Sequence, residues 1–394
     1  MDVAAAAQPV ARILAGVPMH NANLYHRIRF SVVDVAVWLE LPQQAGPPQT
    51  LLICRDIELD RARQQARVDR VACPADFAPA GGLSGDREVA TAQAAAECLR
   101  RAGIRQVVAD RSLPLLFAEV IQQAGIEVLC DPQFGVLERR RKDPQELAWI
   151  QEAQRVTEQA VALACRMIAS AKAGPDGVLW QDGQVLSSER VRAAIDHFLL
   201  DQGYLNTTAI VAGGTQGADC HESGSGPLRT GEPIIIDVFP RNRQTLYHGD
   251  CTRTIVHGNC PPPVRRMHQA VVEAKAAAMQ AAKAGITGQQ VHRQAAEVLH
   301  RWGYHVGPPN QNCPPKTAFM PHGTGHGLGL EVHESPLLDQ NGPPLLAGDV
   351  VSIEPGLYLP GLGGVRVEDL VVITEEGCQN LNSLPDDLEW KESV

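Results

Sequence analysis

Two aspartates stand in apolar segments of the C-terminal half of this 394-residue chain. The segment PIIIDVFP places Asp237 directly after three isoleucines, and YHGDCTRTIV contains Asp250. The polar loop RNRQTL lies between them, so a hairpin would bring both aspartates onto neighbouring strands, and onto one face in the right register. Two carboxylates at such a short distance repel one another unless a cation binds between them. The alternative is two independent aspartates, each paired with a nearby arginine.

A second group of candidate residues is the segment PHGTGHGLGLEVHE, which contains His322, His326 and His333. Its repeated glycines disfavour a helix and suit an extended backbone that packs closely against another strand or a ligand. The order of residues is not HExxH, which excludes the zincin class of metalloprotease. A single histidine would be read as a satisfied packing residue. Three in one short segment indicate a ligand or catalytic role.

Two further segments, VVSIEPGLYLPG and GGVRVEDLVVIT, place Glu354 and Glu368 in apolar strands. Glutamates are rare in such places unless they are paired or bind a cation. Arg366 stands two residues before Glu368, so both side chains point to one face of the strand. The alternative is a buried Arg–Glu pair with a purely structural role.

Together these segments offer four carboxylates and one imidazole as metal ligands: Asp237, Asp250, His326, Glu354 and Glu368. Four carboxylates balance the charge of two divalent cations. Oxygen donors with one imidazole favour Mn²⁺, Co²⁺ or Fe²⁺ over a zinc site built from thiolates. We therefore expect two divalent ions, manganese first, with cobalt, iron or zinc as alternatives. Such a pair can hold a bridging water and lower its pKa toward about 7.

The elements before residue 140 predict a mixed α/β domain. β-Branched and aliphatic residues indicate strands at 30–41, 49–54, 105–110 and 126–130. Residues 86–102 have the composition of a helix that ends at Gly103, and residues 75–85 form a loop rich in Pro, Gly and Ser. A boundary near the segment ERRRKD separates this domain, residues 1–140, from a second one, residues 141–394.

The second domain is predicted to be α+β. Pro144 near the start of a helix and Glu146 in its first turn are N-terminal helix signals. Further helices are expected at 187–203, 263–284 and 288–302. Strand patterns occur at 209–212, 233–239, 251–256, 349–354 and 364–374. These strands would form a sheet of hairpins that carries the candidate ligands.

Composition narrows the class of protein. The chain is 44% hydrophobic and 20% charged, which is typical of a globular protein, and its length suggests two domains. Its net charge of −10 argues against nucleic acid as a general partner. No run of about 18 apolar residues occurs, and the apolar stretch 13–18 is too short for a signal-peptide core. We therefore expect no membrane partner and a cytoplasmic location.

The cysteines are scattered along the chain and include no CxxC pair, so neither a zinc knuckle nor a thioredoxin-like motif is indicated. The pattern predicts reduced thiols in a cytosolic protein, with a secreted disulfide protein as the alternative. The ten are Cys54, Cys73, Cys98, Cys130, Cys165, Cys220, Cys251, Cys260, Cys313 and Cys378.

The order of the motifs resembles that of the pita-bread metallopeptidases. Asp, Asp, GHGxG, IEPG and RxED follow one another as in this family, which contains proline aminopeptidase, prolidase, methionine aminopeptidase and creatinase. The resemblance is strong over residues 140–394. Over residues 1–140 it is weak and points to the smaller N-terminal domain of the creatinase and proline-peptidase branch. It implies a pita-bread fold for the C-terminal domain, with an antiparallel sheet flanked by helices.

The resemblance also implies roles for single residues. Asp237 would bind one metal ion, Asp250 and Glu368 would bridge both ions, and Arg366 would pair with the bridging carboxylates. His326 and Glu354 would complete the second site, and Glu354 would handle the proton of the bridging water. Three histidines would contact the substrate: His221 and His333 near the scissile bond, and His322 in the proline pocket.

The branch that fits best is the proline-directed one. Creatinase-like members use no metal, whereas all five ligands are present here, and methionine aminopeptidases normally lack the N-terminal domain. The expected function is therefore an Xaa-Pro aminopeptidase, with an Xaa-Pro dipeptidase (prolidase) as the alternative. A catalytically silent binding protein of the same fold is the alternative of another class. A proline-containing peptide is the expected substrate, and a homodimer the expected assembly.

Overall fold

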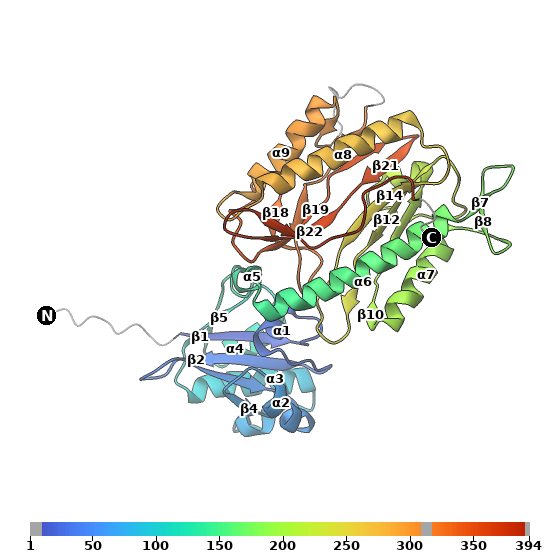
Figure 1. The fold of residues 1–394 in the computed structure, drawn as a ribbon. Coiled ribbons are helices and arrows are strands. Elements are labelled where there is room, and N and C mark those ends of the chain that lie inside the picture. The colour runs from blue at the N-terminus through green and yellow to red at the C-terminus, as the bar shows by residue number, and fades with distance from the viewer. Residues whose placement is uncertain (1–9, 309–316, 391–394) are drawn as a thin grey trace. The chain divides into compact units, whose positions relative to one another are not determined.

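The computed structural model describes residues 10–308 and 317–390. The chain divides into two compact units, Met1–Arg139 and Arg140–Val394. Figure 1 shows the course of the chain through its helices and strands.

The first unit is built on one mixed sheet of six strands in the order β4-β3-β2-β1-β5-β6. Its strands are β1 (Ala11–Gly16), β2 (Ala36–Leu41), β3 (Gln49–Ile53), β4 (Arg70–Ala72), β5 (Gln106–Ala109) and β6 (Glu127–Cys130). Its α-helices are α1 (Ala22–Ile28), α2 (Leu59–Gln65), α3 (Arg87–Arg101), α4 (Leu115–Gln123) and, at the boundary, α5 (Val136–Arg140). Two 3-10 helices are η1 (Asp56–Glu58) and η2 (Pro74–Phe77).

Two features of this unit differ from the prediction. The short apolar stretch at 13–18 contains most of β1, a central strand that pairs with both β2 and β5. The strand predicted from residue 30 begins only at Ala36. Phe30 and Val32 are buried in the core although they belong to no strand. An apolar pattern reports burial, and here burial occurs without strand pairing.

The helices of the second unit begin close to their predicted positions. They are α6 (Pro144–Ala169), α7 (Ser188–Asp201), α8 (Pro262–Ala281) and α9 (Gly288–Arg301), with the 3-10 helix η3 (Gly214–Ala218). The start of α6 is a capping box, in which the Asp143 carboxylate accepts from N of Glu146 at 2.8 Å. The Glu146 carboxylate accepts in return from N of Asp143, also at 2.8 Å. The two side chains satisfy backbone donors that a helix start leaves open.

The strands of the second unit form several small sheets. A three-stranded sheet has the order β11-β12-β14, and a five-stranded sheet the order β18-β17-β19-β22-β23. A four-stranded sheet has the order β15-β16-β20-β21, and two smaller ones are β7-β8-β9 and β10-β13. The bounds of β7 to β14 are Lys172–Ala173, Leu179–Gln181, Gln184–Val185, Tyr204–Leu205, Ile210–Gly213, Pro233–Val238, Arg241–Asn242 and Cys251–Val256. Those of β15 to β23 are His305–Val306, Phe319–Met320, Gly325–Gly327, Glu334–Leu338, Val350–Ile353, Gly356–Leu359, Gly363–Arg366, Asp369–Ile373 and Cys378–Asn380.

Two pairs of helices cover these sheets (Figure 1). Helices α6 and α7 pack on β11, β12 and β14, where Val156 and Ile195 share a buried cluster with Ile236. Helices α8 and α9 pack on the five-stranded and four-stranded sheets, where Val271 and Leu299 share a cluster with residues of β19, β21 and β22. The expected antiparallel sheet flanked by helices is therefore confirmed, although it consists of separate smaller sheets.

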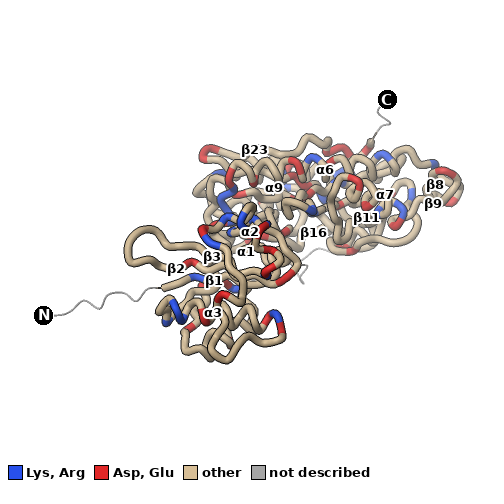
Figure 2. Tube along the Cα trace, turned by 90° about the horizontal axis from the view of Figure 1, so that it is seen from below, with Lys and Arg blue, Asp and Glu red and all other residues tan. Residues whose placement is uncertain are grey.

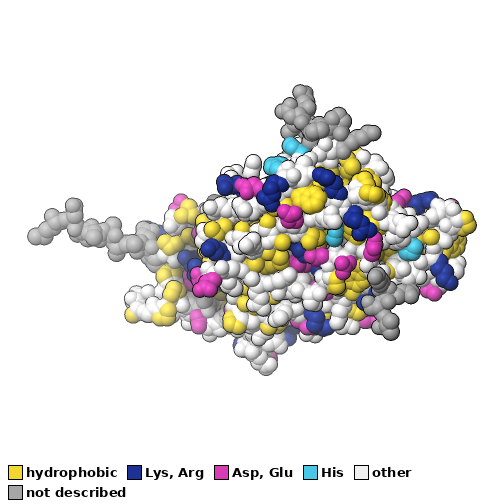
Figure 3. Space-filling model, turned by 45° about the horizontal axis from the view of Figure 1, so that its top comes forward, with side chains coloured by type: hydrophobic (Ala, Val, Ile, Leu, Met, Phe, Trp, Pro, Cys, Tyr) yellow, Lys and Arg dark blue, Asp and Glu magenta, His cyan; other side chains and the backbone are white. Residues whose placement is uncertain are grey.

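The remaining observations concern the charged residues, the helices and the cysteines of the described chain. Basic and acidic residues are interspersed along the trace in Figure 2, and their side chains are interspersed on the face shown in Figure 3. No helix of the described residues is long and apolar enough to cross a membrane. The nine cysteines within the described ranges are free thiols. Cys313 lies outside those ranges.

Candidate metal centre

The hairpin of β12 and β14 places the two candidate aspartates on one face. The strands are antiparallel, and Asp237 lies opposite Thr252. Asp250 precedes Thr252 by two residues, so its side chain points to the same side as that of Asp237. Both are buried, with 8% and 3% exposed surface. The predicted pairing of neighbouring strands is therefore confirmed.

His326 occupies the middle of the short strand β17, which lies between β18 and β19. The glycines on either side allow this close packing. A Cβ atom on Gly325 would lie 2.0 Å from O of Ser352 on β19, and one on Gly327 would lie 2.5 Å from O of Ser335 on β18. The close backbone approach expected from the glycine pattern is confirmed, and it fixes the His326 ring over the site.

Glu354 directly follows a strand, and Glu368 lies in the break between two strands. Glu354 follows β19, and its N–H donates to O of Thr324 at 2.8 Å. The single strand predicted at 364–374 is wrong, because Val367 and Glu368 separate β21 from β22. These two strands belong to different sheets, and N of Glu368 donates to O of Thr252 on β14 at 3.0 Å. The break turns the Glu368 side chain toward the aspartates.

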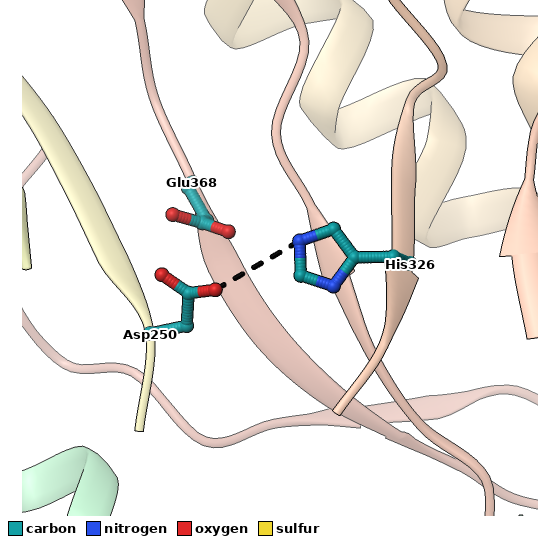
Figure 4. Close-up of side chains that lie close together, drawn as sticks. All are labelled: Asp250, His326 and Glu368. Carbon is teal, nitrogen blue, oxygen red and sulfur yellow. Dashed lines mark ion pairs between the residues drawn. The ribbon is translucent and has the colours of Figure 1, made fainter. Parts of the chain in front are cut away.

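The side chains of Asp250, His326 and Glu368 converge in Figure 4. One ligand atom from each lies within 4.8 Å of those of the other two. Nε2 of His326 is 3.8 Å from Oδ2 of Asp250 and 3.1 Å from Oε1 of Glu354. Asp237 and Glu354 line the same cavity as these three residues. All five predicted ligands are thus brought together.

Crowding of buried carboxylates disturbs their protonation. Burial, followed by the charges of Glu368 and Asp237, raises the pKa of Asp250 well above its usual range. Burial and the charge of Glu354 raise the pKa of Glu368 to about 8. At neutral pH Glu368 therefore holds a proton unless a cation replaces it, and the raised pKa of Asp250 acts in the same direction.

His326 and Glu354 shift in opposite directions. Burial opposes the charge of each group, but their mutual hydrogen bond and attraction outweigh it. The pKa of His326 rises to about 9 and that of Glu354 falls to about 2. In the metal-free protein the two form a buried imidazolium–carboxylate pair. His326 must lose its proton before it can bind a metal ion.

The donor set fits divalent cations. Oδ1 of Asp237 is buried and has no hydrogen-bond partner among the described residues. Buried carboxylate oxygens without partners are costly, and a metal ion would satisfy them. Carboxylate oxygens with one imidazole suit a hard or intermediate divalent ion. The arrangement accordingly fits a dinuclear centre held by these five residues.

Arg366 has a different partner from the one expected. Its Nη2 donates to Oδ2 of Asp237 at 2.7 Å, and within the described chain it forms no ion pair with Asp250 or Glu368. The reason is register, since β21 ends at Arg366 and the chain turns before Glu368. The guanidinium therefore orients one carboxylate of the centre and leaves the other oxygen of Asp237 for a cation.

The three candidate substrate histidines line one cavity of about 570 Å³ together with the five ligands. His221 and His333 are exposed, and the His333 ring centroid is 4.4 Å from that of His326. His322 is partly buried, with Nδ1 2.7 Å from O of Gly323. Burial lowers the pKa of both His322 and His333, which favours neutral imidazoles.

Sequence reasoning missed two residues that support the centre. The Tyr358 hydroxyl accepts from Nη1 of Arg366 at 2.8 Å and lies 2.9 Å from Nε2 of His322. Thr252 Oγ1 donates to Oε2 of Glu368 at 2.9 Å. A signal was present in both cases: Tyr358 stands four residues after Glu354 and Thr252 two residues after Asp250, so each has an even spacing from a predicted ligand.

A comparison with known families identifies the centre. Residues 148–375 match the description "Metallopeptidase family M24". The chain belongs to metallopeptidase family M24. The match includes every predicted ligand, and the expected pita-bread family is confirmed.

Individual relatives and solved structures agree with this assignment. The "Xaa-Pro dipeptidase" of Pyrococcus furiosus is 32% identical over 61% of this chain, and the match spans 62% of that protein's own length. The protein of the same name from Pyrococcus horikoshii is 30% identical over 71% of this chain and 73% of its own length.

Among solved structures, the prolidase from Pyrococcus horikoshii OT3 has a TM-score of 0.75 at 24% identity, covering 96% of this chain and 95% of that one. The X-Pro aminopeptidase from Thermotoga maritima has a TM-score of 0.76 at 22% identity, covering 96% and 97%. These M24 structures share the fold of both units of this chain.

Proposed function

We propose that this chain is a dinuclear metal-dependent exopeptidase that hydrolyses the peptide bond preceding proline. The observation that carries the proposal is the convergence of four carboxylates, three of them buried, and one imidazole in a cavity that three further histidines line. Asp237, Asp250, His326, Glu354 and Glu368 would hold two divalent ions. Manganese is the metal we propose first, with cobalt, iron or zinc as alternatives. When bound, the ions would lower the pKa of a water molecule toward about 7.

The protein groups divide the remaining work. Glu354 accepts and returns the proton of the attacking water, since its carboxylate lies at the centre and beside His326. His221 and His333 are exposed to the cavity and donate hydrogen bonds to the scissile carbonyl, where negative charge develops. His322 borders the proline, and Arg366 keeps Asp237 oriented.

Proline makes a dedicated site necessary. An Xaa-Pro bond is a tertiary amide, and proline has no N–H and a fixed φ near −65°. Enzymes that hold an N–H after the scissile bond cannot use this residue. Imidazole donors need no such N–H, and the rigid ring loses little entropy on binding.

The names of the relatives favour a dipeptide substrate, whereas the charges in the cavity favour a longer peptide. The Pyrococcus relatives are named Xaa-Pro dipeptidases, whereas a Mycoplasma genitalium relative is named a putative Xaa-Pro aminopeptidase. The dipeptidase is the candidate that the relatives favour. The aminopeptidase is the candidate that the charges of the cavity favour, as argued below.

Hydrolysis of Gly-Pro, Ala-Pro-Ala and Ala-Ala-Ala by the manganese-loaded enzyme tests the proposal. We expect Ala-Pro-Ala or Gly-Pro to be cleaved with a much higher kcat/KM than Ala-Ala-Ala. Equal cleavage of Ala-Pro-Ala and Ala-Ala-Ala would reject proline specificity. No turnover of any peptide by a metal-loaded sample would favour a silent binding protein. A homodimer and a cytoplasmic location stay predictions.

A further inference from the structure

The cavity around the metal centre is poor in cationic side chains. Among the described residues that line it, Arg366 is the single Lys or Arg, and the other basic groups are imidazoles. The acidic side chains include Asp339 in addition to the four carboxylate ligands. Two divalent ions would balance the four ligand carboxylates, and the charges of Arg366 and Asp339 would remain.

Arg366 is already engaged and cannot easily serve a substrate. Its Nη1 donates to O of Cys220 at 3.2 Å and to the Tyr358 hydroxyl at 2.8 Å. Its Nη2 donates to Asp237, and only 4% of its side chain is exposed. A substrate carboxylate that recruited this guanidinium would break a buried ion pair, which is costly.

Asp339 lines the cavity, and its Oδ1 accepts a hydrogen bond from N of Gln340 at 2.7 Å, which leaves the negative charge without a close cation. Its side chain is 46% exposed, and its ion-pair neighbour in the described chain is Nε2 of His292, 3.9 Å away. Nδ1 of His292 lies 2.9 Å from Oγ1 of Thr324, which holds the ring in place. A contact of 3.9 Å is too long for a hydrogen bond, so His292 compensates Asp339 weakly.

The position of Asp339 is well defined. It follows β18 directly, and its backbone O accepts from N of Gly342 at 2.9 Å. The preceding O of Leu338 accepts from N of Thr324 at 2.7 Å. Beside it, Leu337 also lines the cavity and is 51% exposed. The rim therefore presents an apolar and an anionic side chain next to one another.

We propose that Asp339 determines substrate specificity by disfavouring a free carboxylate on the proline of the substrate. A dipeptide Xaa-Pro brings such a carboxylate to a rim where the described lining residues offer no unengaged Lys or Arg. A longer peptide brings a neutral amide in its place. The chain would therefore prefer substrates that continue beyond proline. This inference rests on the proposed function and names the substrate class of the same site.

The test compares Ala-Pro with Ala-Pro-amide, which differ in charge and hardly in shape. We expect the manganese-loaded enzyme to show a higher kcat/KM for the amide, and added salt to reduce the preference because it screens the repulsion. Asp339→Asn should reduce the ratio of amide to acid by roughly 5-fold, the scale of one partly exposed charge pair. Asp339→Lys should shift the ratio further toward the acid.

Asp201→Asn is the matched control, because this aspartate is exposed at the end of α7 and does not line the cavity. It should leave the ratio unchanged. Thermal melting of each variant checks the fold, and the salt dependence of the unmodified enzyme tests the charge effect without any variant. Equal cleavage of Ala-Pro and its amide, or an unchanged ratio in Asp339→Asn, would overturn the role of Asp339 and leave the proposed function intact. Cleavage of neither substrate would contradict the proposed function itself.

Discussion

Nε2 of His326 lies 3.1 Å from Oε1 of Glu354, and both side chains line the same cavity. Without metal this contact is an ion pair, since the pKa of His326 rises to about 9 and that of Glu354 falls to about 2. A metal ion needs the neutral imidazole as its ligand. The same atoms therefore hold either a proton or a cation.

The first prediction follows from this competition: metal binding at pH 7 releases protons. His326, with a pKa of about 9, and Glu368, with a pKa of about 8, are protonated at pH 7 in the metal-free protein. Both pKa values are raised above pH 7, so a metal ion must displace a proton from each group. A fall in pH therefore weakens metal binding. Affinity should rise roughly tenfold per pH unit for each proton released.

Calorimetric titration with Mn²⁺ in two buffers of different ionisation enthalpy measures the proton number. We expect between one and two protons at pH 7 and fewer at pH 9.5, above both pKa values. An equal heat in both buffers at pH 7 would contradict the prediction.

The second prediction concerns Glu354→Gln. The amide keeps the shape of the side chain but can neither accept a proton nor balance the metal charge. Loss of a general base typically lowers turnover by about 10²–10⁴-fold. We expect this loss in kcat with a small change in the thermal stability of the metal-loaded enzyme, in which His326 is neutral and its ion pair with Glu354 is absent. Glu375→Gln, at an exposed position after β22, is the matched control. Near-normal kcat in Glu354→Gln would show that the residue is structural.

More of the candidate site than of the strand pairing could be predicted from the sequence. Asp237 and Glu354 each follow an apolar run, and carboxylates are rarely buried in such places without a partner. The partner of Arg366 depended on where the strand breaks, and an apolar stretch from 364 to 374 does not reveal that Glu368 leaves the sheet. Side-chain facing changes completely with a one-residue change of register.

The first unit shows the opposite limit. Its sheet combines parallel and antiparallel pairs. β1 lies between β2 and β5, and about ninety residues of chain separate β1 from β5. Local patterns identify strands but not their distant partners.

Asp339 could not be selected from the sequence either, since its exposure at the cavity depends on the turn after β18. Nothing in the segment LLDQNG alone distinguishes it from any turn aspartate.

The third prediction is loss and recovery of activity with metal. Exhaustive treatment with a chelator should abolish peptide hydrolysis, because four carboxylates and one imidazole alone cannot activate water. Mn²⁺ or Co²⁺ should restore activity best, as the oxygen-rich donor set implies. Metal analysis of the restored enzyme should give about two ions per chain. Full activity in a sample shown to be metal-free would reject a metallopeptidase mechanism.

The fourth prediction concerns Asp369, directly behind the ligand Glu368. Its carboxylate accepts from Nη2 of Arg253 at 2.8 Å and from Nζ of Lys275 at 2.6 Å. The side chains of these two cations are 1% and 5% exposed. Asp369→Asn removes the buried charge and leaves the cations with Asp386, whose side chain is 30% exposed. Breaking a buried pair typically costs about 3–5 kcal/mol of unfolding free energy.

Denaturant unfolding of the metal-free protein at pH 7 measures this loss. The control is Asp387→Asn at an exposed position, which should change the free energy of unfolding by less than about 0.5 kcal/mol.

The pH dependence of stability gives a second test of Asp369. Burial acts to raise the pKa of Asp369, but the charges of Arg253 and Lys275 outweigh it and lower the value. A carboxylate with a lowered pKa in the folded state stabilises the protein above its unfolded pKa, and this stabilisation is lost as the pH falls through the folded value. The difference in stability between the native sequence and Asp369→Asn should therefore be large at pH 7 and shrink toward pH 3. A difference that stays constant over this range would show that Asp369 stabilises the fold by packing and not by charge.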